Sequence, residues 1–451
     1  MMTDFILALG LVMSPSSQLR LAGLPVGPGE LCLVAWLLFA LVHPSRRKTE
    51  PVAPALRRLR WFWIALGLSL AAGFVTGAVT GDAQDTSLVL HDLFAYVLLA
   101  AVSMTSVIDP SARQRLDNVA WLVAVLGTGS LLLQLLQAWG ILATFALDPW
   151  YWDRMRGWSQ NPNQLAFLCC ALALLSLHLM EQAGTGGAKL LAGVCLILPV
   201  WVGYLSKSDT FRFAVLAGIA VFVMMKLAHW LKADRGVLGL RSAFAWCIAL
   251  CLPFSVLMAP LLISAQTVQA VLSLTKNGGE QAAVEADLRF TLWQQAVRRG
   301  LDSGLLGLGP GPHLEIPAGI IAARQVELEP ANLDHPKING TFNFEAHNTY
   351  LDLLTQGGGL ALASFAWLIG AAFLTARKAG TAGLAAMLFG VAVAAVTGNV
   401  VRSPLFWFAI TLCLVRLEHH QRLAATRPRP AIRQRTAARG LGTREGAYVK
   451  T

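Results

Sequence analysis

Charged residues are scarce in this chain, and their scarcity excludes a water-soluble globular protein. Of 451 residues, 14% are charged and 55% are hydrophobic, and apolar runs long enough to cross a bilayer recur along the whole sequence. These runs also lack strict alternation of apolar and polar residues, which favours helices over a membrane β-barrel. The composition therefore predicts an all-α polytopic membrane protein.

Disulfide and metal-binding patterns are lacking as well. The seven cysteines all fall within apolar runs, without the spacing of a metal site or a disulfide framework, and are interpreted as small core residues. The first apolar stretch, Phe5 to Met13, follows Asp4 and has no Lys or Arg before it. Because a signal peptide needs a basic leading region, this stretch is expected to be a retained first span.

The apolar runs predict about twelve transmembrane helices and one large outer loop that itself contains helices. The expected spans are 4–14, 28–44, 61–80, 88–107, 117–138, 162–180, 188–205, 211–230, 242–263, 348–375, 381–399 and 404–416. Spans one to nine thus occupy residues 1–263, the loop 264–346, and three more spans 347–416. The Pro- and Arg-rich tail at 417–451 is expected to be disordered on an anionic cytoplasmic leaflet.

The basic residues predict the orientation. If both ends of the chain are cytoplasmic, the inner segments hold 23 of the 36 Lys and Arg residues, as the positive-inside rule requires. The net charge of +11 is then explained by topology, and no nucleic-acid partner is expected. The remaining basic residues, Arg402 among them, lie mostly in outer loops or at outer ends of spans, against this bias. Because an Arg deep in a bilayer costs about 2.5–3.5 kcal/mol, they call for a compensating anion such as a phosphate.

Two outer segments carry this pattern before the large loop. In "DPWYWDRMRGWSQNPNQLA", residues 148–166, Arg154 and Arg156 stand among aromatic residues of an interfacial belt, with ordinary snorkelling as the alternative for both. In "LSKSDTFRFAVLAG", Arg212 lies one turn inside the apparent start of a span, and Lys207 precedes it. A cation at the position of Arg212 is harder to interpret as a plain surface charge.

The large outer loop supplies a third segment. "VEADLRFTLWQQAVRRG", residues 284–300, spaces Leu288, Leu292 and Ala296 at helical intervals. It is expected to form a helix on or near the membrane that carries Arg289, packs through Trp293 and ends at Gly300. "GLLGLGPGP", residues 304–312, follows it. Its amides are candidates for approaching a phosphate, but it matches neither a P-loop nor a dinucleotide fingerprint, and a plain Gly-Pro turn is favoured.

The loop returns to the membrane at "EAHNTYLDLL", and His347 stands at that crossing. Its position alone is also typical of a histidine that caps a helix or lies at the membrane interface. An imidazole titrates near neutrality, however, and His347 is expected at the same depth as Arg212 and Arg289. A base beside arginines suits the transfer of a group from a phosphorylated donor to an alcohol. Glu345 either orients His347 or faces water, and both interpretations stay open.

Taken together, these motifs resemble the bacterial O-antigen ligase and O-antigen polymerase family. The likeness is carried by "RGWSQNPNQLA", "SKSDTFR", "DLRFTLWQQAVRRGLDSGLLGLGPG" and "HNTYLDLLTQGGGLAL", and is strongest from about 150 to 375. It implies a multi-pass enzyme of the bacterial inner membrane with a periplasmic active site. The implied reaction is inverting glycosyl transfer from undecaprenyl diphosphate to an acceptor sugar hydroxyl, without a nucleotide sugar, cofactor or essential metal.

The resemblance also assigns roles. His347 is implied as the general base, and Arg289 and Arg212 as the residues that bind the diphosphate. Further contacts to the diphosphate or glycan are expected from Arg156, Arg154, Lys207, Asn161, Asn163, Asn348, Tyr350 and Glu345. The acceptor is lipid A-core for a ligase, the favoured interpretation, or another lipid-linked repeat for a polymerase; membrane lipids surround both.

Two departures from the family pattern matter. Family members commonly carry a Ser-Arg pair. Here Ser206 is followed by Lys207, and Arg212 follows Phe211, so either cation can be the diphosphate ligand. Gln356 stands where an acidic residue is common in the family. A flippase or other transporter of lipid-linked glycans is an alternative, although charges deep in several spans and internal repeats are then expected. A metal-dependent glycosyltransferase would rely on Asp82 and Asp85, a weak pair.

Overall fold

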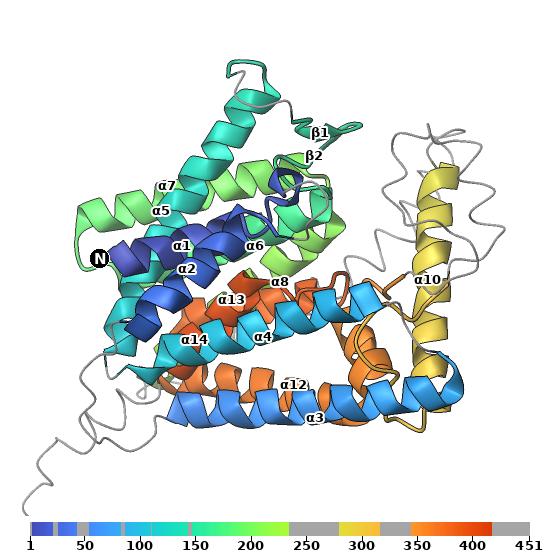
Figure 1. Ribbon diagram of the computed structural model, residues 1–451. Coiled ribbons are helices and arrows are strands. Elements are labelled where there is room, and N and C mark those ends of the chain that lie inside the picture. The colour runs from blue at the N-terminus through green and yellow to red at the C-terminus, as the bar shows by residue number, and fades with distance from the viewer. Residues whose placement is uncertain are drawn as a thin grey trace, which may run out of the picture.

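The protein is a bundle of helices (Figure 1), seen in a computed structural model that describes residues 2–20, 26–42, 54–82, 86–109, 111–142, 147–233, 279–315 and 344–416. The helices are α1 (Met2–Met13), α2 (Pro28–Val42), α3 (Pro54–Thr80), α4 (Thr86–Ile108), α5 (Ala112–Ala138), α6 (Pro162–Gln182), α7 (Gly186–Leu205), α8 (Asp209–Ala233), α10 (Gly279–Asp302), α12 (Thr349–Lys378), α13 (Ala382–Ala394) and α14 (Pro404–Leu414). A small antiparallel hairpin joins β1 (Trp150–Tyr151) to β2 (Arg154–Met155).

The helices confirm the expected membrane character. Among the described residues, seven helices are long and apolar enough to cross a bilayer, and α1, α2, α13 and α14 are shorter apolar helices. Each expected span coincides with one of these helices, except the span at 242–263, which lies outside the described residues together with the tail at 417–451. The chain is a multi-pass membrane protein, and the total of twelve spans stays a prediction.

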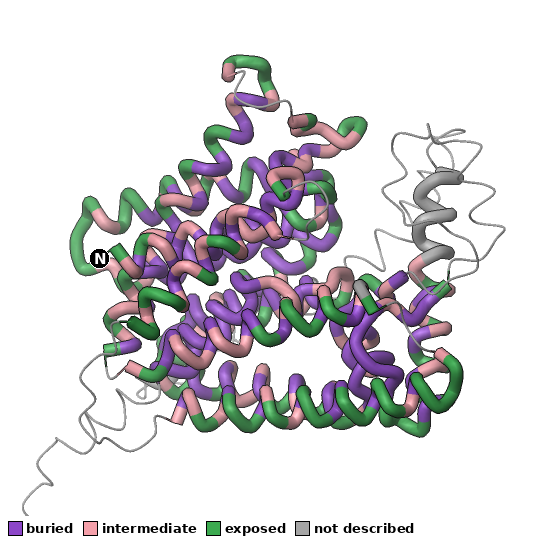
Figure 2. Tube along the Cα trace, in the orientation of Figure 1, coloured by how far each residue is buried: buried purple, intermediate pink, exposed green. Residues whose placement is uncertain are grey.

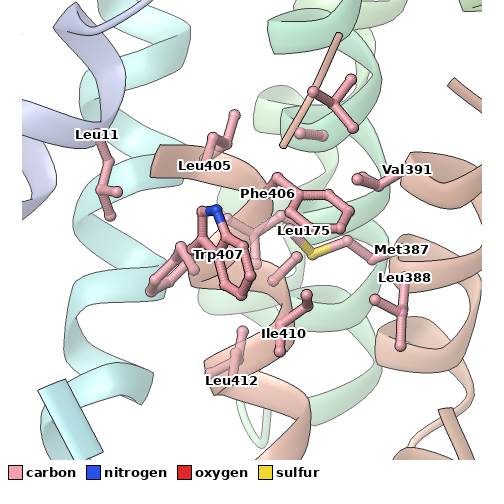
Figure 3. Packing of buried hydrophobic residues seen from close by; sticks show 14 of the residues in the cluster. Leu11, Leu175, Met387, Leu388, Val391, Leu405, Phe406, Trp407, Ile410 and Leu412 are labelled. Atoms are coloured by element: carbon pink, nitrogen blue, oxygen red, sulfur yellow. The ribbon is translucent and has the colours of Figure 1, made fainter. Parts of the chain in front are cut away.

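The shortest of these helices forms the centre of the bundle. Every residue of α14 is buried, and Figure 3 shows Phe406 and Trp407 packed among side chains of α6 and α13. Trp407 also donates its indole N–H to the carbonyl of Val401 at 2.7 Å. The long helices α3 and α12, by contrast, keep an exposed apolar face over much of their length (Figure 2). The core thus lies around α14, and the exposed apolar faces suit lipid.

Loops expected on the same side of the membrane meet at the same end of the bundle. At one end, Gln18 N–H donates to the carbonyl of Trp158 at 2.9 Å, and the hydroxyls of Thr210 and Thr397 lie 2.6 Å apart. At the other end, Arg416 pairs with Asp117 and lies 3.3 Å from His178, while Lys226 pairs with Glu181. The first end, which carries His347, is called the site end below.

Two local expectations were wrong. Residues 348–375 do not form an uninterrupted helix, because Gly358 adopts φ 66° and ψ −160°, outside the helical region, and breaks α12. The α10 helix passes Gly300 and ends at Asp302. Gly300 is buried inside the helix, where an added Cβ would stand 2.7 Å from Cγ of Leu354, so close packing rather than termination explains this glycine.

Candidate functional site

His347 lies directly before α12, in a backbone conformation that needs support. Its φ is 50°, in the left-handed region that side-chain-bearing residues seldom adopt, and the residue is exposed. Asn348 is the N-cap of α12: its side-chain oxygen accepts from the backbone N–H of Tyr350 at 3.1 Å. The imidazole is therefore presented at the surface while the chain on its C-terminal side is fixed.

The segment before His347 is fixed as well. Phe344 pairs with Leu314 through two backbone hydrogen bonds of 3.0 and 3.1 Å. The N–H of Ala346 donates to Oδ1 of Asp352 at 2.7 Å, and its carbonyl accepts from the indole N–H of Trp293 at 3.0 Å. These bonds restrain the backbone immediately before His347 from two different elements.

Trp293 brings α10 and its Arg289 to this segment. Arg289 lies one turn before Trp293 on the same helix, which places a guanidinium on the element that is hydrogen-bonded beside His347. The buried face of α10, Leu292 and Ala296, packs with Leu314, Phe344 and Ala346 in a small apolar cluster. The sequence therefore correctly placed the helix and its buried face, and Trp293 packs as expected while also fixing the backbone beside His347.

An open groove of about 680 Å³ runs between α10 and the start of α12. It is lined by Phe290, Trp293, Gln294, Val297, Arg298, Leu301, Asp302, Asn348, Tyr350 and Leu351. Phe290, Val297 and Leu301 are exposed there, and they repeat at intervals that keep them on one face of α10. The groove is thus apolar along its wall and reaches Asn348, the neighbour of His347.

Arg402 connects this segment to α4, a link that sequence reasoning missed. From the turn between α13 and α14, its guanidinium pairs with Glu345 through one nitrogen and with Asp92 through the other. Burial alone would lower the pKa of Arg402, but the carboxylates of Glu345 and Asp92 raise it, so the guanidinium stays charged. Glu345 thus binds Arg402 rather than facing water. Asp92 and Asp352, lone carboxylates inside apolar runs, were the available signal.

The Gly-rich turn, residues 304–312, is a structural element. The N–H groups of Leu308 and Gly309 donate to the carbonyls of Thr355 and Gln356 at 2.8 and 2.9 Å, and the N–H of Gly311 donates to Asp92 at 3.1 Å. These three amides are occupied by the protein itself, which supports the plain-turn interpretation over a phosphate cradle. The turn packs against the break in α12, where Gly359 N–H donates to the carbonyl of Leu305 at 2.8 Å.

Gln356 explains one departure from the family pattern. Its side-chain oxygen accepts from the hydroxyl of Tyr96 at 2.8 Å, and its side-chain nitrogen donates to the carbonyl of Gly311 at 3.2 Å. A carboxylate can accept the first bond but cannot donate the second. The amide at this position therefore suits a role in joining α4, α12 and the Gly-rich turn.

Arg212 belongs to the site end through the first turn of α8. Thr210 and Thr397 are in hydrogen-bond contact, and the Gly398 carbonyl next along the chain accepts from the hydroxyl of Thr349 at 2.7 Å. This chain of contacts joins the start of α8 to the residues that follow His347. Arg212 itself is exposed, and its Nη1 lies 3.3 Å from Oδ1 of Asp209. Its guanidinium also lies over the ring of Tyr204, with Cζ 5.9 Å from the ring centroid.

The remaining predicted cations form a second group around the hairpin and the turn between α7 and α8. Arg154 donates to the carbonyl of Ser206 at 3.2 Å and to the side chain of Asn163 at 3.3 Å. Lys207 pairs with Asp153 at 2.6 Å, and this bond lowers the pKa of that carboxyl. These side chains have partners within the protein.

Two further predicted residues support local structure beside this group. Arg156 pairs with Asp148 at 3.1 Å and stacks over Tyr151. Asn161 is the N-cap of α6, and its side chain accepts from Asn163 N–H at 2.8 Å, ahead of Pro162 at the first helical position. Among the carboxylates considered for a metal, Asp82 lies 3.0 Å from Arg299, and Asp85 lies outside the described residues.

Comparison with known families places part of the chain in a described family. Residues 194–366, from within α7 to within α12, match the family described as O-Antigen ligase. This segment of the chain is similar to O-antigen ligases. Members of this family are membrane glycosyltransferase-like enzymes, either ligases or polymerases. The match contains Arg212, Arg289 and His347 but ends before Arg402. No curated protein matches the chain.

Proposed function

We propose that this O-antigen ligase-type protein transfers a glycan from undecaprenyl diphosphate to a sugar hydroxyl of lipid A-core. The acceptor oxygen attacks the anomeric carbon as the bond from that carbon to the diphosphate breaks, and the configuration inverts. His347 takes the proton of the hydroxyl, and the diphosphate leaves on its lipid carrier. The observation that carries the proposal is the exposed His347, held in a left-handed conformation beside the arginine-bearing helix α10.

Arg289 and Arg212 are proposed to bind the diphosphate. Charge develops on the leaving oxygen as the glycosidic bond breaks, and a guanidinium stabilises it through two parallel hydrogen bonds. Arg289 is supported by its place on α10, one turn from the hydrogen bond to Ala346. Arg212 is proposed because Thr210 connects its helix turn to Thr397 beside the His347 segment; like Lys207, which pairs with Asp153, it has a carboxylate partner, Asp209.

The other predicted contacts are proposed to bind the glycan or to shape the site. Asn348 and Tyr350 line the groove between α10 and α12, whose apolar wall suits the polyprenyl chain of the donor. Arg154, Arg156, Lys207, Asn161 and Asn163 gather at the hairpin side of the site end and are proposed to meet the glycan. Their hydrogen bonds within the protein support a preorganised polar surface.

The site end is proposed to face the periplasm from the bacterial inner membrane. The distribution of charge along the sequence supports this orientation, because the segments expected on the cytoplasmic side hold 23 of the 36 Lys and Arg residues. A lipid-linked donor and a lipid-anchored acceptor both present their head groups at that surface. A reporter that is active only in the periplasm should therefore be active when fused near residue 320, and an inactive fusion would reverse the orientation.

The deciding experiment measures covalent transfer by the purified protein, with undecaprenyl-diphosphate-linked glycan and lipid A-core as substrates. The wild type should form glycan-modified lipid A-core, and His347→Ala should lose transfer while still binding donor. His229→Ala is the matched control, because His229 is an exposed histidine of α8 outside the site end. Full transfer by His347→Ala would refute the proposed base.

The choice of substrate separates the alternatives. Longer lipid-linked chains formed from donor alone would identify a polymerase, and donor movement across vesicles without a covalent product would identify a transporter.

Arg289→Lys tests the diphosphate contact. The substitution keeps the positive charge but loses the planar fork that binds two phosphate oxygens at once. We expect kcat to fall about 10²-fold, the magnitude typical of losing one transition-state donor. Arg377→Lys is the control, because Arg377 is an exposed arginine in the last turn of α12, away from the site end. Unchanged turnover in Arg289→Lys would leave Arg289 with an anchoring role only.

A further inference from the structure

Arg402 occupies an unusual place between the site and the bundle. Its two terminal nitrogens pair with carboxylates from separate elements, Asp92 of α4 and Glu345 of the segment leading into α12. Asn399 adds a 2.9 Å bond to the second oxygen of Glu345, and the Gly311 N–H adds a 3.1 Å bond to the second oxygen of Asp92. The side chain of Arg402 is 22% exposed, which leaves it little access to a ligand.

The ion pair between Arg402 and Glu345 fixes the chain two residues before His347. A left-handed φ is unfavourable for a side-chain-bearing residue, so the surrounding contacts must hold His347 there. After His347, Asn348 and Thr349 are fixed by hydrogen bonds to α12 and to the turn at 395–400. Before it, Ala346 is fixed by Asp352 and Trp293, and Glu345 by Arg402 and Asn399. These contacts of residues 345–349 are called the clamp below, and Arg402 connects the clamp to Asp92 of α4.

We propose that Arg402 is a positioning residue: by holding Glu345 against Asp92, it fixes His347 in the conformation that accepts the acceptor's proton. The inference rests on the proposed function. Arg402 lies outside the segment that matches the family, and both of its terminal nitrogens are occupied by carboxylates. It therefore acts on the reaction through the backbone of His347, without contact to either substrate.

Arg416 provides a matched control within the same chain. It also pairs with a carboxylate, Asp117, and lies near His178, but at the opposite end of the bundle. Loss of either arginine removes a charged partner from a carboxylate and should lower the stability of the protein. Only the loss of Arg402 should alter the geometry of His347.

The experiment compares Arg402→Gln, Arg402→Lys and Arg416→Gln in steady-state transfer assays, normalised to folded protein. We expect Arg402→Gln to lower kcat about 10²-fold with little change in KM, because displacement of a reacting group by about 1 Å costs that much. The kcat of Arg402→Lys should lie between those of Arg402→Gln and the wild type, because lysine keeps the charge but reaches one carboxylate at a time. Glu345→Gln combined with Arg402→Gln should be no worse than either alone, since both break one clamp.

A second measurement does not depend on transfer. Diethyl pyrocarbonate modifies exposed imidazoles, and mass spectrometry reports the rate at His347 relative to His229 in the same molecule. Arg402→Gln should change that ratio severalfold, and Arg416→Gln should leave it unchanged. An unchanged ratio in Arg402→Gln, equal kcat losses in both variants, or a rise in donor KM alone would overturn the proposal. A changed ratio in a protein without transferase activity would instead keep the clamp and reject the proposed reaction.

Discussion

Gly73→Ala should damage the site end from within a transmembrane helix. Gly73 of α3 faces the Gly-rich turn, and a Cβ added there would meet the carbonyl of Gln356 and stand 2.6 Å from the N–H nitrogen of Gly309. Those two groups form a 2.9 Å hydrogen bond with each other, and the neighbouring bond from Leu308 to Thr355 is 2.8 Å. A methyl group at residue 73 therefore pushes into the contact that fastens the turn to α12.

The expected loss of stability follows from these contacts. Overpacking a tight interface costs about 1–3 kcal/mol. The two hydrogen bonds contribute about 1 kcal/mol each. Alanine offsets about 1 kcal/mol of this through its higher helix propensity. The free energy of unfolding should therefore fall by about 2–4 kcal/mol, a large share of the stability of a typical protein.

Gly67→Ala is the control for this prediction. Gly67 lies in the same helix, is exposed, and has no atom within 4 Å of an added Cβ. Thermal unfolding in detergent, followed by tryptophan fluorescence, should show a lower apparent melting temperature for Gly73→Ala and no decrease for Gly67→Ala. Transfer should fall in Gly73→Ala as well, because the turn carries Gly311, which binds Asp92 beside Arg402. Equal melting temperatures in the two variants would refute the packing argument.

Two further predictions concern the described contacts around the site. Burial lowers the pKa of His313, whose Nε2 lies 2.7 Å from the carbonyl of Gly309, so it is neutral when folded and takes up a proton on unfolding below about pH 6.5. The contribution of His313 to stability should therefore be full above that pH and decrease as the pH falls. The melting temperature of His313→Gln should decrease less than that of the wild type between pH 7.5 and 5.5. An identical dependence of melting temperature on pH in both proteins would contradict this role. Asn161→Ala should lower the free energy of unfolding by about 1 kcal/mol, because it removes the N-cap of α6. Asn161→Ser should keep most of that stability, because serine also caps helices. Equal melting temperatures of the two variants would count against capping.

The sequence predicted the helices well because their signal is local. Long apolar runs bounded by polar residues placed every described span, and the spacing of Leu292 and Ala296 predicted the buried face of α10. The break at Gly358 was not predicted, because it depends on a contact with Leu305 from a distant part of the chain. The three consecutive glycines at 357–359 have low helix propensity, but they do not identify Leu305 as the partner or Gly358 as the point of the break.

The candidate site depends on longer-range contacts. His347 and Arg289 were singled out from a boundary position and a helix pattern, and their roles came from the family resemblance and stay predictions. The structure joins the elements that carry them through Trp293. Arg402 was noted only as a cation on the outer side, since its partners Asp92 and Glu345 lie far from it in the sequence. Ionisable residues inside apolar runs are costly and usually have partners. Such residues point to a network, but its members become known only when the fold brings them together.

The break in α12 separates two kinds of evolutionary constraint within one helix. Before Gly358, the short first part is bound to α10, the Gly-rich turn and the turn at 395–400, so most substitutions there disturb the placement of His347. After Gly358, outward residues such as Leu360, Trp367 and Leu374 are exposed apolar side chains. They can be exchanged for other apolar residues as bilayer thickness or lipid composition changes. Relatives adapted to different membranes should therefore diverge along the second part of α12 while keeping the first.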